Sequence, residues 1–203
     1  MAGVTGADPD RTTSRLTLSN AITLLRLVCV PFVCVAILDR NWSLACLLFW
    51  LAVGTDFVDG RIARARGESS RFGGLLDHAS DASFVVAGLA AVALGGRITP
   101  MLPVLVVIAF AQYVLDSRWL AGEPLRASGL GRWNGILYFV PLGIVVTREW
   151  AGLAQPSDRV VALLTYALAA STAVSIADRA LTLLLLHRRG RQAGNRGPDS
   201  PGF

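Results

Sequence analysis

Residues 55–81 read TDFVDGRIARARGESSRFGGLLDHASD, and this stretch decides how the whole chain is interpreted. It holds four aspartates and four arginines, yet it joins two apolar segments of a chain that is 53% hydrophobic and only 16% charged. Charged side chains in such a place are costly unless they are paired or bind an ion. The stretch therefore indicates either a network of ion pairs or a binding site.

The rest of the chain has the composition of a membrane protein. Its 203 residues have a mean hydropathy of +0.53, far above that of an ordinary globular domain. A helix needs about 20 apolar residues to cross the hydrocarbon layer. Runs of about this length cover residues 20–39, 42–66, 71–96, 99–120, 133–150 and 157–187. The sequence thus predicts an all-α, polytopic membrane protein with six transmembrane helices.

The arginines give this bundle an orientation. With the N-terminus in the cytosol, thirteen of the nineteen basic residues fall in cytosolic segments and four fall on the opposite side. Positive charge accumulates on the cytosolic side of membrane proteins, so we expect both ends and residues 55–81 in the cytosol. The predicted location is the inner (plasma) membrane. Residues 1–15 and 188–203 are expected to be disordered ends, and residues 16–187 to form one transmembrane domain.

The four aspartates are spaced so that helices bring them together. Asp56 and Asp59 are three residues apart and Asp77 and Asp81 are four apart, so each pair lies on one helix face. Two adjacent antiparallel helices would then gather four carboxylates. Ligand sets made only of oxygen suit hard divalent cations, magnesium or manganese above all. We expect a two-metal site, because two such ions balance four carboxylates.

The neighbouring residues complete this prediction and also supply its alternative. Three small residues would let a ligand approach the helix backbones closely, namely Gly60, Ala63 and Gly73, and Arg64 is left to face an anionic group. Arginines alone are poor counter-ions for the aspartates, since Arg61, Arg64 and Arg66 can extend to the headgroups. An interfacial charge network is the alternative. Its cations would be Arg61, Arg64, Arg66 and Arg71.

The motif D56-x2-D59-G60-x2-A63-R64-x8-G73-x3-D77-x3-D81 resembles the signature of the CDP-alcohol phosphotransferase (CDP-alcohol phosphatidyltransferase) family at every defined position. The stretch N20-A-I-T23-L-L-R26 is similar to the opening of the first helix in bacterial members. The resemblance covers roughly residues 16–187. It implies six helices with cytosolic ends, a homodimer and no nucleic-acid partner.

The resemblance implies a metal-dependent transfer of a phosphatidyl group from CDP-diacylglycerol to an alcohol, with release of CMP. The metal ligands that it implies are Asp56, Asp59, Asp77 and Asp81. Asp81 would also be the catalytic base that accepts the proton of the incoming hydroxyl. The residues that it places around the CDP moiety are Gly60, Ala63, Arg64 and Gly73.

The acceptor is less well defined by the sequence. Arg132 and Gly135 stand where relatives with phosphorylated acceptors carry lysine and threonine, and Arg118, Arg126 and Arg132 are candidates to bind an acceptor phosphate. The alternative is a positively charged cytosolic loop. The opening helix and chain length are most similar to the bacterial phosphatidylglycerophosphate and cardiolipin synthase branches. This favours glycerol 3-phosphate or phosphatidylglycerol, with inositol phosphate and serine still open.

Two further groups have alternative interpretations. Asn20, Thr23 and Arg26 line one helix face. They are interpreted either as a helix start whose arginine reaches the headgroups, or as residues that lie near the nucleotide or brace the site. Asp178 and Arg179 are interpreted as an interfacial or interhelical charge pair, or as part of the acceptor cavity.

Other functional classes fit the sequence less well. A cation transporter also carries carboxylates inside the membrane, but it places them near the midplane and without arginines that repel a cation. A protein that only binds a lipid nucleotide is the third class. The complete set of four aspartates argues against it, because loss of one ligand would be the simplest route to an inactive relative.

Overall fold

All regular secondary structure in the described part of the chain is α-helical. The structure is a computed structural model and describes residues 18–66, 71–119 and 129–194, with side chains for residues 23–57, 76–115, 129–182 and 185. The helices are α1 (Leu18–Leu38), α2 (Trp42–Arg66), α3 (Arg71–Leu94), α4 (Met101–Trp119), α5 (Gly129–Leu137), α6 (Phe139–Ala151) and α7 (Asp158–Gly194). The prediction of an all-α protein is confirmed for these residues.

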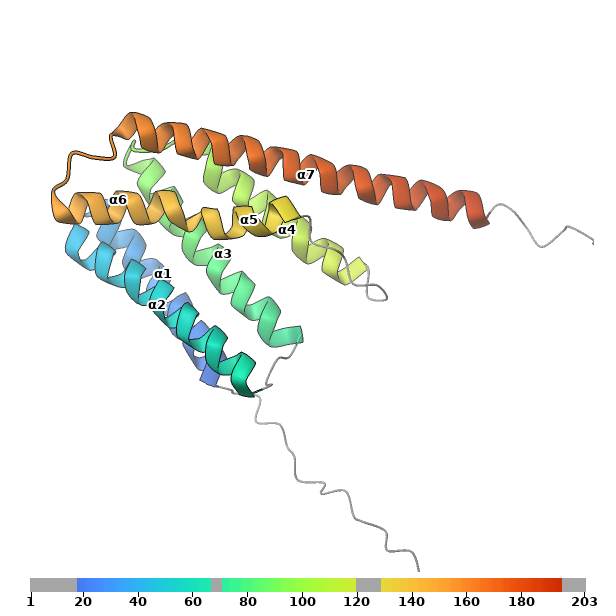
Figure 1. The fold of residues 1–203 in the computed structure, drawn as a ribbon, viewed down its shortest axis with the longest axis horizontal. Coiled ribbons are helices and arrows are strands. Elements are labelled where there is room, and N and C mark those ends of the chain that lie inside the picture. Colours follow the sequence, from blue (N-terminus) through green and yellow to red (C-terminus); the bar gives the residue numbers. More distant parts are fainter. Residues whose placement is uncertain (1–17, 67–70, 120–128, 195–203) are drawn as a thin grey trace, which may run out of the picture.

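The predicted apolar runs and the observed helices agree closely at most of their ends, and the fifth run, 133–150, is divided into α5 and α6. The division lies at Tyr138, whose N–H still donates to the carbonyl of Asn134 at 3.0 Å. Pro141 has no N–H to donate to the carbonyl of Leu137, so the hydrogen-bond ladder is interrupted at this turn. The two helices continue almost in line (Figure 1), and Gly129–Ala151 together form one apolar segment.

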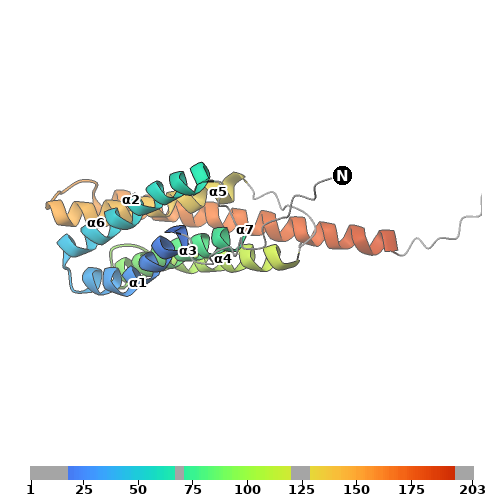
Figure 2. The ribbon, with the colours of Figure 1, turned by 90° about the horizontal axis from the view of Figure 1, so that it is seen from below.

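The end of the last helix differs from the prediction. The disordered tail was expected from residue 188, whereas α7 continues to Gly194. Helix formers such as arginine, glutamine and alanine dominate these residues and can extend a helix beyond the bundle. Both views show α7 reaching past the other helices (Figures 1 and 2).

The helices pack around α3. Helix α1 lies against both α2 and α3, while α3 also contacts α4 and α6. Helix α7 packs on α4 and on the α5–α6 pair. The core between α3, α4 and α6 contains fully buried side chains, among them Phe84, Leu89, Leu102 and Leu142.

Two glycines allow α6 to approach its neighbours closely. A Cβ atom on Gly88 of α3 would lie 2.6 Å from Cδ2 of Leu142 on α6. A Cβ atom on Gly143 of α6 would lie 2.8 Å from the ring of Phe49 on α2. Small residues at such crossings are typical of helices that pack within a membrane.

The outer surface is apolar. Leu94 is 79% exposed, Leu163 71% and Leu47 64%, and they belong to a large set of exposed apolar side chains. A surface of this kind requires lipid or another apolar partner. Among the described residues, three segments are long and apolar enough to cross a membrane: Leu76–Leu94, Gly129–Ala151 and Asp158–Thr182. Shorter apolar helices cover Thr23–Leu38, Trp42–Phe57 and Met101–Leu115. These features indicate a membrane protein.

Candidate metal centre

Carboxylates from two helices meet at one arginine of a third helix. Asp56 comes from α2, Asp77 and Asp81 come from α3, and Arg26 comes from α1. Arg26 donates from Nη2 to Oδ1 of Asp56 at 3.0 Å and from Nη1 to Oδ1 of Asp77 at 3.5 Å. Nη1 also forms an ion pair with Oδ1 of Asp81. The packing of α1 against both neighbours thus brings three of the four predicted carboxylates to one point.

Burial across this cluster is uneven. The side chain of Arg26 is 1% exposed, whereas those of Asp56, Asp77 and Asp81 are 46%, 34% and 24% exposed. The guanidinium therefore forms the buried floor of the cluster, and the carboxylates lie between this floor and the surface. A ligand that approaches from the surface meets carboxylate oxygen first.

The register of α1 against α3 is fixed beside the cluster. The hydroxyl of Ser80 donates to the backbone carbonyl of Thr23 at 3.2 Å, and both residues are buried. Thr23 precedes Arg26 by three residues, and Ser80 directly precedes Asp81, so this bond joins the two chain segments that carry the ion pair. The face of α1 that the sequence identified through Thr23 and Arg26 is turned toward α3.

The charges of the cluster suit a divalent cation. Three carboxylates face one guanidinium, so the described groups carry a net charge of −2 when all are ionised. The available donors are carboxylate oxygens, which magnesium and manganese prefer. The side chains present fit such an ion by both charge and donor type.

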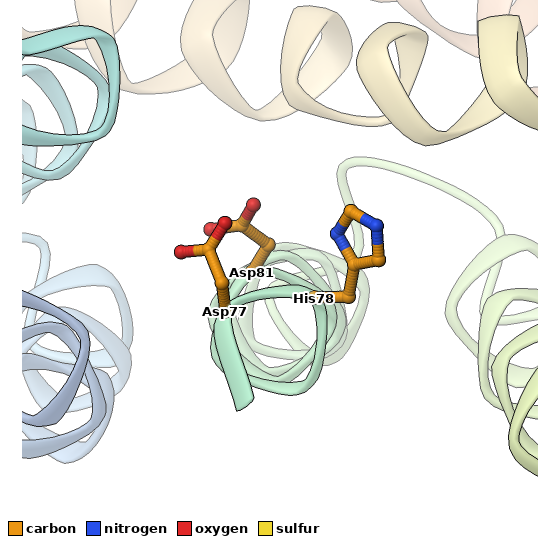
Figure 3. A group of neighbouring side chains, drawn as sticks. All are labelled: Asp77, His78 and Asp81. Carbon is orange, nitrogen blue, oxygen red and sulfur yellow. The ribbon is translucent and has the colours of Figure 1, made fainter. Parts of the chain in front are cut away.

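His78 lies beside the carboxylates on a different side of α3. One ring nitrogen of His78 and one oxygen each of Asp77 and Asp81 lie within 4.8 Å of one another. Figure 3 shows the two carboxylates extending together while the imidazole projects from another side of the helix. The ring lies edge-on to Tyr113 of α4, with 5.9 Å between ring centroids. His78 thus contacts α4 as well as the edge of the cluster.

Several predicted residues lie outside the described side chains, so their placement stays a prediction. Those from the aspartate motif are Asp59, Gly60, Ala63, Arg64 and Gly73, and those from the predicted acceptor site are Arg118 and Arg126. Arg132 is described and lies exposed on α5.

Arg26 corrects two interpretations of the sequence. The interpretation that its side chain reaches the headgroups is wrong, because Arg26 is 3% exposed and points into the bundle. The argument that arginines are poor counter-ions for the aspartates considered only Arg61, Arg64 and Arg66, and Arg26 supplies one positive charge within the cluster. Charge balance is therefore a weaker argument for two metal ions. Asn20 lies within α1 and not at its cap, since the helix begins at Leu18.

A second charged cluster, which the sequence did not indicate, lies at the other end of α3. Arg148 donates from Nη2 to Glu149 at 2.8 Å and to Asp158 at 2.7 Å, and from Nη1 to the carbonyl of Pro156 at 2.8 Å. Glu149 also accepts from Arg97, which follows α3. The guanidinium of Arg97 lies 4.8 Å from the ring centroid of Trp42 at the start of α2. This cluster joins the ends of α2, α3, α6 and α7.

One member of the polar pair of the last helix, Arg179, contacts α4. The guanidinium of Arg179 lies 5.5 Å from the ring centroid of Tyr113, and Asp178 is exposed. Tyr113 thereby lies between Arg179 of α7 and His78 of α3. Among the alternatives considered for this pair, an interhelical contact is described for Arg179.

Known proteins resemble this chain over most of its helical part. Residues 16–177 match the family of CDP-alcohol phosphatidyltransferases. The CDP-diacylglycerol--glycerol-3-phosphate 3-phosphatidyltransferase of Cereibacter sphaeroides is 33% identical over 135 residues, which are 62% of this chain and 61% of that protein. The enzyme of the same name from Haemophilus influenzae is 27% identical over 137 residues, or 63% of this chain and 74% of that protein.

A shorter match reaches a higher identity. The enzyme of the same name from Escherichia coli strain K12 is 43% identical over 63 residues, which are 30% of this chain and 35% of that protein. The chain thus spans about three fifths of the length of the Cereibacter sphaeroides relative and about a third of the Escherichia coli one. The family match includes all four aspartates and the arginine that joins three of them. This protein belongs to the CDP-alcohol phosphatidyltransferase family.

Proposed function

We propose that this protein is a metal-dependent phosphatidyltransferase, which moves the phosphatidyl group of CDP-diacylglycerol to an alcohol and releases CMP. The observation that carries the proposal is the meeting of Asp56, Asp77 and Asp81 around Arg26, with more negative than positive charge and a surface-facing side. Family membership supplies the reaction class. The alternative of a cation transporter is not consistent with membership of this family.

The carboxylates have different tasks in this proposal. Asp56, Asp59 and Asp77 would hold magnesium or manganese, and Asp81 would both hold metal and act as the base. Metal bound there would draw charge from the donor diphosphate and make CMP a better leaving group. The four residues proposed to hold the CDP moiety are Gly60, Ala63, Arg64 and Gly73.

Asp81 is well placed to receive a proton. Its side chain is 24% exposed and lies on the inner part of the surface-facing cluster. The acceptor oxygen would attack the phosphorus next to the diacylglycerol, its proton would pass to Asp81, and the bond from that phosphorus to the CMP oxygen would break.

We propose glycerol 3-phosphate as the first acceptor to test. The relatives named above carry this alcohol in their names, and Arg118, Arg126 and Arg132 are the candidates to bind its phosphate. Phosphatidylglycerol is the next acceptor to test, followed by inositol phosphate and serine. Arg132 is exposed on α5, which suits a residue that meets a soluble acceptor.

The membrane arrangement is proposed from the sequence. Six spans, with the fifth divided into α5 and α6, would place both ends and the aspartates on the cytosolic side of the inner membrane. The donor lipid tails would remain in the bilayer beside the exposed apolar surface. The protein is proposed to act as a homodimer, with residues 16–187 as its catalytic domain.

The proposal is tested with purified protein in detergent, CDP-diacylglycerol and Mg²⁺ or Mn²⁺. CMP release is followed while each acceptor is supplied alone, and EDTA serves as the control. Release that needs both metal and one acceptor supports the proposal and identifies that acceptor. Folded, metal-loaded protein that releases no CMP with any acceptor would contradict it and favour a protein that only binds the lipid nucleotide.

A further inference from the structure

We propose that Arg26 is a resident cation of the carboxylate site: it keeps Asp56, Asp77 and Asp81 assembled in the protein stripped of metal, and its electrostatic role diminishes when a divalent cation binds. The inference rests on the proposed metal site. It concerns the stability and metal affinity of the site, so it can be tested separately from turnover.

The geometry shows one guanidinium serving two helices. Its Nη2 atom bonds Asp56 of α2, and its Nη1 atom contacts Asp77 and Asp81 of α3. A planar guanidinium offers donors in fixed, diverging directions, which a lysine ammonium on a flexible stem does not. Arg26 is therefore able to hold carboxylates of α2 and α3 at the same time.

The charges explain why this cation is needed without metal. Asp56, Asp77 and Asp81 converge on a space that Arg26 closes from the buried side. Without Arg26, the like charges of three carboxylates would oppose their approach. A divalent cation on the surface-facing side would supply the missing positive charge. Loss of Arg26 should therefore destabilise the metal-free protein more than the metal-loaded protein.

Thermodynamic linkage gives a second, quantitative consequence. If Arg26 stabilises the metal-free state more than the loaded state, then removing it must strengthen metal binding. The gain in binding free energy equals the difference between the two stabilisation energies. A residue that only orients the carboxylates would act in the opposite direction, since its loss would weaken metal binding. The two roles predict opposite shifts of one measured quantity.

The experiment compares Arg26→Met with the unaltered protein by thermal unfolding in detergent, first with EDTA and then with saturating Mn²⁺. We expect Arg26→Met to lower the Tm by about 5–10 °C in EDTA, and by less than half of that in Mn²⁺. In a titration followed by the same signal, the midpoint for Mn²⁺ should move to a concentration about tenfold lower. Arg26→Lys, which keeps the charge but loses the fork, should fall between the two proteins.

Arg148→Met is the matched control. Arg148 is another buried arginine with two acidic partners, so its loss should lower the Tm by the same amount in EDTA and in Mn²⁺. The inference would be overturned if Arg26→Met lowered the Tm equally in EDTA and in Mn²⁺, or if its Mn²⁺ midpoint moved to a higher concentration. If Arg26→Met does not fold, the same two measurements on Arg26→Lys decide: the loss of Tm in EDTA compared with that in Mn²⁺, and the direction in which the Mn²⁺ midpoint moves. If the unaltered protein shows neither a Mn²⁺-dependent Tm nor CMP release, the proposed function itself fails.

Discussion

The two charged clusters of this bundle are made from the same kinds of side chain but have different charge balances. Around Arg26, one guanidinium meets three carboxylates. Around Glu149, two guanidiniums, those of Arg97 and Arg148, meet two carboxylates, those of Glu149 and Asp158. Counting the described groups alone, the first cluster has a net charge of −2 and the second is neutral.

The difference in balance separates a site from a structural junction. In the neutral cluster, Arg148 has two carboxylates and the carbonyl of Pro156 as acceptors, so the positive charge is fully offset by protein groups. Among the described groups of the Arg26 cluster, carboxylates are in excess, and a bound cation would offset this excess. We infer that residual charge, more than the presence of ion pairs, marks the functional end of this bundle.

The largest expected effect lies within the unbalanced cluster. Asp81→Asn should lower the rate of CMP release by about 10²–10⁴-fold, because an amide cannot accept the hydroxyl proton. Binding of CDP-diacylglycerol should persist, since the other carboxylates remain. Radiolabelled donor binding and the rate of CMP release are measured on the same preparation.

Asp56→Asn sharpens this result. Asp56 is proposed only as a metal ligand, so its change should weaken Mn²⁺ and donor binding together. Equal and mild effects of Asp56→Asn and Asp81→Asn on rate and binding would contradict the division of roles between the two aspartates.

The next largest effect is expected for a substitution in the neutral cluster, which should change stability and not activity. Glu149→Gln removes the charge that Arg97 and Arg148 share, leaving partly buried guanidiniums without full compensation. The free energy of unfolding should fall by about 1–3 kcal/mol. Thermal unfolding should show the same loss in EDTA and in Mn²⁺, and CMP release at low temperature should stay within about twofold. A loss that depends on Mn²⁺ would break the distinction between the clusters.

Most of the bundle could be predicted from the sequence. Long apolar runs determine where helices lie in a membrane protein, and the ends of α1, α2, α3 and α4 lie within a few residues of the prediction. The spacing of Asp77 and Asp81 placed them on one face because a helix repeats every 3.6 residues, and the two carboxylates extend together in Figure 3.

The partners across helices could not be predicted in the same way. Arg26 precedes Asp56 by 30 residues and Asp81 by 55, and no local periodicity states which helix faces which. The neutral cluster combines Arg97 of the α3–α4 connection, Arg148 near the end of α6 and Asp158 at the start of α7. In the sequence analysis Arg97 and Arg148 contributed only to the count of basic residues on one side of the membrane, and Asp158 was not identified. Contacts of this kind follow from helix packing, which the sequence pattern alone does not specify.

A smaller effect is expected at the edge of the neutral cluster. The Asp158 side chain is 73% exposed although it bonds Arg148 at 2.7 Å. Solvent screens such a pair, so Asp158→Asn should reduce the free energy of unfolding by about 0–1 kcal/mol. Thermal unfolding beside Glu149→Gln gives the comparison. If Asp158→Asn lowered the free energy of unfolding more than Glu149→Gln, the junction would depend more on the Arg148–Asp158 pair, which reaches α7, than on the Arg97–Glu149 pair, which reaches the end of α3.

The smallest effect is expected for His78→Ala, which defines the limit of the functional cluster. His78 has a ring nitrogen within 4.8 Å of carboxylate oxygens, but its ring projects from another side of α3 and lies edge-on to Tyr113. If the carboxylates alone hold the metal, His78→Ala should leave the Mn²⁺ midpoint and CMP release within about threefold, a difference of about 0.7 kcal/mol or less. Imidazole binds manganese and zinc more readily than magnesium. A tenfold weaker Mn²⁺ midpoint with an unchanged Mg²⁺ midpoint would therefore add His78 to the ligands, and the functional cluster would then include the imidazole that contacts α4.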